Sequence, residues 1–270
     1  MNKLLKLQSK GACSGINGIL FFGLPGCGKT LLANAFANES GRYFFKFSPA
    51  DIQSMWIGQS QKNLKDIFSQ AKKKAPSILF IDELDSIGFS RSELQAHTDQ
   101  KATINQLLIE LNNIGDSNAI VIAATNCLSS IDNALKRSGR LDWKIPIFPP
   151  NASERSELFN HYLLATQFYE NLSVSTEFWN LVDYEELGRQ STRLTPSDIE
   201  LVCKEIRNDI LLEEISPRLT TLDIVSYIRN IRQGGLTLTE FQVAQFLSEC
   251  KSLSIKSSKL EILESEWSIK

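Results

Sequence analysis

This 270-residue sequence has few of the residues that zinc-dependent and disulfide-stabilised proteins need. It contains two histidines, His97 and His161, and neither lies in an H-E-x-x-H pattern, so a zinc hydrolase would have no ligands on this chain. Its five cysteines are widely spread and include no C-x-x-C pair, which argues against both a zinc knuckle and a disulfide framework. We therefore expect reduced thiols.

Long apolar runs and an excess of one charge are also absent from the sequence. No apolar run approaches the roughly 18 residues that would span a bilayer. The N-terminal segment MNKLLKLQSKGAC is too interrupted by polar residues to be a signal peptide. Lys and Arg number 29 and Asp and Glu number 31, so the net charge of −2 does not favour binding to a polyanion. We expect a cytoplasmic protein with no membrane span and no nucleic-acid partner.

Short β-rich runs alternate with longer helical runs in the first half of the chain. The expected strands are 18–22, 43–47, 77–82, 119–126 and 144–148, and the expected helices are 29–39, 59–74 and 101–112. This alternation predicts a parallel sheet covered by helices.

The pattern changes after Pro149 and Pro150, and the residues that follow to about Ile231 have only helical periodicity. A second break comes at Gly234 and Gly235, after which LTEFQVAQFLSECKSL is expected to be helical and the remaining residues to form a short polar tail. We expect an α/β domain at 1–150, an all-helical domain at 151–232, and a C-terminal helix and tail at 233–270.

A phosphate-binding motif lies between the first expected strand and the first expected helix. The segment GLPGCGKT fits G-x-x-x-x-G-K-[ST]; its glycines let backbone N–H groups surround a phosphate, Lys29 can reach the β and γ phosphates, and Thr30 offers a hydroxyl to Mg²⁺. The alternative is a glycine-rich turn without a ligand. The expected nucleotide-binding residues are Gly23, Leu24, Pro25, Gly26, Cys27, Gly28, Lys29, Thr30 and Leu31, together with Asp82.

Polar residues follow two later strands. SILFIDE places Asp82 and Glu83 at the C-terminal end of a buried strand, the edge at which open α/β sheets bind ligands. Asp82 can hold Mg²⁺ through water, and Glu83 can orient and polarise the attacking water, although such a pair could also cap a helix. Asn126, at the end of AIVIAATN, could reach the same water or the γ phosphate, or could be only a turn residue.

Four motifs in this order resemble the AAA family of ATPases, and the likeness extends over residues 18–251. They are GLPGCGKT as Walker A, ILFIDELDSI as Walker B, IAATN as sensor 1, and IDNALKRSGRLDWKIPI as the second region of homology. The resemblance implies a P-loop NTPase of the α/β class, with a five-stranded parallel sheet, helices on both faces and a small all-helical lid domain. It also implies ATP and Mg²⁺ as cofactors, a homo-oligomeric ring that is usually a hexamer, and a protein-remodelling activity.

Two further motifs gain a role from this resemblance. Arg140, in SGR, lies where the family inserts an arginine finger into the ATP site of a neighbouring subunit; the alternative is a surface ion pair. MWIGQS resembles the family's pore loop, in which Trp56 would grip a polypeptide, with Ile57 and Gly58 after it; the alternative is a core aromatic. Trp143 stands where the family usually has a second arginine, and it cannot supply a charge.

The sequence also departs from the family elsewhere. RLTPSDI, at 193–199, occupies the place of the family's G-x-x-G-A-D, so the wall that faces the adenine is altered. Only 22 residues precede the phosphate-binding motif, so we expect either that the chain is a fragment that lacks an upstream domain or that a separate adaptor protein recruits its substrates.

The favoured interpretation is an ATPase that remodels polypeptides, as an unfoldase or a disassembly translocase. Lys29, Glu83, Asn126 and Arg140 are the expected catalytic residues, with Arg140 acting in trans. Two alternatives stay open: a nucleotide-dependent scaffold or switch with slow turnover, and an AAA-type loader or motor on nucleic acid.

Overall fold

The chain divides into two compact units in the computed structural model. The first comprises Met1–Gly23 and Lys29–Ile147, and the second comprises Leu24–Gly28 and Phe148–Lys270. The structure describes residues 18–49, 60–86, 98–115, 117–164, 182–212, 218–235 and 238–267.

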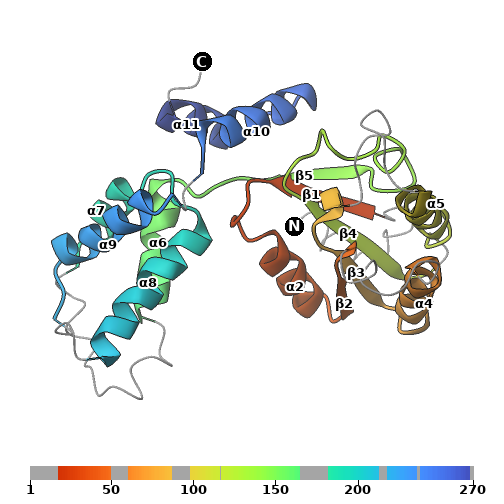
Figure 1. Cartoon of the computed structure of the whole chain (residues 1–270), viewed down its shortest axis with the longest axis horizontal. Helices are drawn as coiled ribbons and strands as arrows, with labels where there is room; N and C mark the ends of the chain where they lie inside the picture. Colours follow the sequence, from red (N-terminus) through yellow and green to blue (C-terminus); the bar gives the residue numbers. More distant parts are fainter. Residues whose placement is uncertain are drawn as a thin grey trace. The chain divides into compact units, whose positions relative to one another are not determined.

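A five-stranded parallel sheet forms the centre of the first unit (Figure 1). Its strands are β1 (Gly18–Gly23), β2 (Tyr43–Phe47), β3 (Ser77–Ile81), β4 (Ala119–Thr125) and β5 (Trp143–Ile147). The spatial order is β2-β3-β4-β1-β5, so β1 lies between two strands that come much later in the chain. The predicted parallel five-stranded α/β fold is confirmed.

Helices cover both faces of this sheet. The α2 helix (Lys29–Glu39) lies on one face, and α4 (Ser60–Lys73) and α5 (Thr98–Asn112) lie on the other (Figure 1). Residues of β1, β3 and β4 are buried along the whole length of each strand, because parallel sheets of this kind are covered on both sides. The α5 helix begins three residues earlier than the sequence predicts, at Thr98 rather than Lys101.

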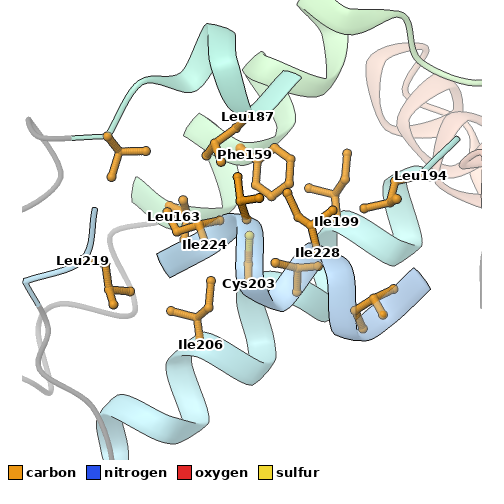
Figure 2. Close-up of a cluster of buried hydrophobic side chains, with 14 of the residues drawn as sticks. Phe159, Leu163, Leu187, Leu194, Ile199, Cys203, Ile206, Leu219, Ile224 and Ile228 are labelled. Carbon is orange, nitrogen blue, oxygen red and sulfur yellow. The ribbon is translucent and has the colours of Figure 1, made fainter. Parts of the chain in front are cut away.

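In the part of the second unit that the structure describes, all of the regular secondary structure is helical. Four of its helices, α6 (Ala152–Leu164), α7 (Tyr184–Gln190), α8 (Pro196–Leu211) and α9 (Thr221–Gln233), surround the apolar cluster drawn in Figure 2. Phe159 at the centre of this cluster has no exposed surface. The α8 helix starts at a capping box in which Thr195 and Asp198 exchange hydrogen bonds, which satisfies backbone donors that a helix N-terminus leaves free.

Two more helices, α10 (Glu240–Ser252) and α11 (Ser258–Trp267), follow in the second unit. The sequence predicts a polar tail where α11 forms. The helix is stabilised by burial of Leu260, Leu263 and Trp267, three residues spaced along one helical face.

Candidate functional site

Polar residues gather at the carboxyl ends of three neighbouring strands in the first unit. Lys29 follows β1 along the chain, Asp82 follows β3, and Asn126 follows β4. The Lys29 ammonium is buried and donates hydrogen bonds to the Gly23 carbonyl at 2.9 Å and to the Asn126 side-chain oxygen at 2.8 Å. The parallel sheet therefore brings Lys29 and Asn126 together, although 96 residues lie between them.

Thr30 and Asp82 form the second part of the site. The Thr30 hydroxyl donates to Asp82 Oδ2 at 3.0 Å, and the Glu83 backbone N–H donates to Asp82 Oδ1 at 3.1 Å. A hydroxyl and a carboxylate are the oxygen donors that Mg²⁺ prefers, and Mg²⁺ usually keeps several waters. Thr30 and Asp82 thus place a hydroxyl and a carboxylate side by side, a pair of oxygen donors that fits Mg²⁺.

Glu83 has an unusual backbone conformation. Its φ of +50° lies in the left-handed region that non-glycine residues rarely adopt. The next residue, Leu84, is fully buried and begins the short 3₁₀ helix η1 (Leu84–Ser86). Glu83 itself is exposed at the surface. The turn therefore lies between the buried strand β3 and the buried Leu84, and it leaves Glu83 exposed to solvent.

Glycines let the phosphate-binding segment follow its path. Gly23 has a φ of +156° and lies beside Ile147 of β5, where a β-carbon would come within 2.2 Å of the Ile147 carbonyl oxygen. Gly26 and Gly28 have φ values of +71° and +83°, which also favour glycine. Leu31, which the sequence places with the nucleotide-binding residues, has 69% of its surface exposed. Leu24 and Cys27 are buried.

Within the second unit, the tip of this segment contacts the start of α8. The Gly26 carbonyl accepts hydrogen bonds from the Ser197 backbone N–H and from the Ser197 hydroxyl, both at 3.3 Å. A β-carbon on Gly26 would lie 2.7 Å from the Thr195 hydroxyl oxygen. Ser197 of RLTPSDI therefore binds the Gly26 backbone directly, and Thr195 leaves no room for a side chain at Gly26.

Arg140 binds residues of its own chain. Its Nε donates to the Asn112 side-chain oxygen at 2.9 Å and its Nη1 donates to the Ala134 carbonyl at 2.6 Å. Trp143, three residues later, begins β5, pairs with Ile19 of β1 and packs partly buried against the apolar core of the sheet. The side chain that replaces a second arginine is thus a packing residue.

Two residues of this region carry no motif that singles them out in the sequence. Lys46 forms an ion pair with Asp82, and Asn112 binds Arg140. The signal for Lys46 is weak but present, because it is the one charged residue in the β2 segment YFFKF. Asn112 gives no signal, because its position at the end of a helix is an ordinary place for an asparagine. The predicted pore-loop residues Trp56, Ile57 and Gly58 lie outside the described residues.

The described residues contain neither a membrane-spanning helix nor a larger cluster of metal-binding side chains. None of the helices in those ranges is long and apolar enough to cross a membrane. Over the same part of the chain, no group of three or more His, Cys, Asp or Glu side chains is placed to hold a metal ion.

Comparison with known proteins shows which family this chain resembles in sequence. Residues 19–148 match the model of the ATPase family associated with various cellular activities (AAA). An ATP-dependent zinc metalloprotease FtsH from Parabacteroides distasonis is 38% identical over 192 residues, which are 70% of this chain and 27% of that protein. A cell division cycle protein 48 homolog from Archaeoglobus fulgidus is 36% identical over 204 residues, 75% of this chain and 26% of that protein. The chain therefore spans about a quarter of the length of these relatives.

Proposed function

Because residues 19–148 of this chain are an AAA domain, an ATPase module that uses ATP with Mg²⁺, we propose that the chain hydrolyses ATP to remodel polypeptides as part of a homo-oligomeric ring, a hexamer. The observation that carries the proposal is the grouping of Lys29 with Asn126, and of Thr30 with Asp82, at the ends of β1, β3 and β4. In phosphoryl transfer a protein contributes mainly positioning and charge stabilisation, and these four side chains supply both.

Each residue then has a defined task. Lys29, which binds Gly23 and Asn126 in this structure, would contact the β and γ phosphates. Thr30 and Asp82, the latter through water, would hold Mg²⁺, and the ion would supply positive charge that stabilises the phosphates. Glu83 orients and polarises the attacking water, and Asn126 contacts that water or the γ phosphate. Arg140 serves the site of a neighbouring subunit, where a guanidinium can stabilise the transferring phosphoryl group.

The first test is the rate of ATP hydrolysis per subunit as a function of protein concentration, with Glu83→Gln as the blank. A site that a neighbouring subunit completes requires a rate per subunit that rises steeply with protein concentration. The Glu83→Gln variant should show no such rise. A rate per subunit that does not depend on concentration would contradict the role of Arg140 in trans.

Remodelling needs a separate assay, because hydrolysis alone does not show work on a substrate. A fluorescent protein fused to an unstructured segment loses its fluorescence when it is unfolded. We expect Trp56→Ala to keep much of the ATP hydrolysis and to abolish this loss of fluorescence. Unfolding by Trp56→Ala at the parent rate would overturn the threading role of Trp56.

A slow nucleotide-dependent switch is the second candidate function. The packing of Trp143 against the sheet favours it, because an apolar side chain that packs against the core supplies no charge to a neighbouring subunit as an arginine would. The Arg140 guanidinium is also occupied by Asn112 and Ala134. Tight nucleotide binding with a hydrolysis rate at the Glu83→Gln level, at ring-forming concentration, would favour the switch over the motor.

A further inference from the structure

A lysine contacts the magnesium site from the edge of the sheet. The Lys46 ammonium, on β2, lies 2.9 Å from Asp82 Oδ2. The same oxygen accepts the hydrogen bond from the Thr30 hydroxyl at 3.0 Å. About half of the Lys46 side chain and one fifth of the Asp82 side chain are exposed. One carboxylate oxygen is thus shared by an ammonium group and by the hydroxyl expected to bind Mg²⁺.

The strand register places Lys46 at this position. β2 pairs in parallel with β3 so that Lys46 lies beside Phe80, two residues before Asp82, and the Asp82 backbone N–H donates to the Phe47 carbonyl. Lys46 projects on the same face of β2 as Phe44, since alternate residues of a strand share a face. Phe44 stacks on Phe80 in the core that also contains residues of α2, the helix that carries Thr30.

The electrostatic consequence is a carboxylate whose charge is already balanced. A bare Asp82 would attract a divalent cation, whereas Asp82 with an ammonium at hydrogen-bond distance presents little net charge. An incoming Mg²⁺ must therefore compete with Lys46 for Asp82 and must also tolerate a fixed positive charge nearby.

We propose that Lys46 is a positioning residue that holds Asp82 in the metal-free site and lowers the affinity of the nucleotide-bound site for Mg²⁺. The proposal rests on the assignment of Thr30 and Asp82 as the residues that hold Mg²⁺. It does not depend on remodelling, on ring assembly or on the role of Arg140. Removing the ammonium should strengthen the coupling between Mg²⁺ and nucleotide by about three- to tenfold, the size expected for a screened interaction between charges near a surface.

The experiment measures binding rather than turnover. The dissociation constant of a fluorescent, non-hydrolysable ATP analogue is determined in EDTA and in excess Mg²⁺, and the ratio of the two constants reports the coupling. Lys46→Met keeps the length and the apolar stem of the side chain and removes its charge, and Lys46→Arg is the matched control that keeps the charge. Because each ratio is taken within one variant, a fraction of unfolded protein does not change it.

We expect Lys46→Met to raise the ratio about three- to tenfold at an unchanged dissociation constant in EDTA, and Lys46→Arg to keep the parent ratio. If Lys46→Met gave the same ratio of dissociation constants as the parent protein, the proposal would be overturned. A larger dissociation constant for Lys46→Met in EDTA would also overturn the proposal, because such a loss of affinity would mean that Lys46 binds the phosphates. Asp82→Asn tests the underlying assignment separately: it should lose most of the coupling, and full coupling in that variant would mean that Asp82 does not hold the metal.

Discussion

Replacement of Arg155 by methionine tests how the second unit is held together. Arg155 on α6 has 1% of its surface exposed. Its guanidinium donates to the Pro150 carbonyl at 2.7 Å, to the Gly188 carbonyl at 3.1 Å, and through two nitrogens to the Glu266 carboxylate, each at 3.2 Å. One side chain thus joins the start of α6, the α7 helix and the last turn of α11.

The size of the effect follows from what the substitution leaves behind. Removing one partner of a buried ion pair costs about 3–5 kcal/mol, and leaving a buried carbonyl without a donor costs about 1–3 kcal/mol. The Glu266 side chain is 22% exposed and can recover some hydration, and methionine refills much of the volume. We therefore expect Arg155→Met to lower the free energy of unfolding by about 3 kcal/mol, near the lower end of that range.

Equilibrium urea unfolding, followed by far-ultraviolet circular dichroism, measures this change. Glu266→Gln is the comparison variant, because it removes the counter-charge of the guanidinium but keeps an oxygen acceptor for Arg155 and leaves both carbonyl bonds intact; it should therefore cost less than Arg155→Met. A change below about 0.5 kcal/mol for Arg155→Met would refute the reasoning. An equal loss in both variants would refute the weight placed on the Pro150 and Gly188 carbonyls.

Two more predictions concern packing and pH. A β-carbon at Gly18 would lie 2.2 Å from the Arg140 carbonyl oxygen, so Gly18→Ala should shift the backbone and cost about 2–3 kcal/mol in thermal unfolding, and an unchanged melting temperature would contradict this. Burial raises the pKa of the Cys203 thiol from 9.0 to about 12. The folded state therefore keeps the thiol neutral, whereas the unfolded state loses the thiol proton above about pH 9. The contribution of this thiol to the free energy of unfolding is present below pH 9 and falls by up to about 1.4 kcal/mol per pH unit between pH 9 and 12. Urea titrations at pH 8 and 10 should give a smaller loss of stability in Cys203→Ala than in the parent, and equal losses would show that this thiol does not titrate as expected.

Short-range patterns in the sequence were sufficient to predict most of the first unit. The alternation of apolar strands and longer helical runs predicts the sheet, and α2 and β2 have the predicted bounds, Lys29–Glu39 and Tyr43–Phe47. The phosphate-binding motif predicts where a nucleotide binds because its chemistry is local to eight residues. The roles of the individual site residues, and those of Trp56, Ile57 and Gly58, stay predictions.

Features that depend on long-range contacts were not predictable in the same way. The Lys46 ion pair requires the register between β2 and β3, which no pattern within β2 specifies. The α11 helix was expected to be a tail because its apolar residues are separated by charged and polar ones. Its stability depends on burial within the second unit, including the contact of Glu266 with Arg155, more than one hundred residues earlier in the chain.

The order of strands in the sheet has a consequence for the synthesis of this protein. β1 leaves the ribosome before the other four strands of this sheet, yet its two neighbours are β4, whose Val121 lies beside Gly18, and β5, whose Trp143 lies beside Ile19. Until β4 has emerged, the apolar segment GILFFG has neither of the strands with which it pairs in the sheet. We expect this segment to be the main binding site for chaperones on the nascent chain, and a shorter nascent chain that ends before β4 to be prone to aggregation.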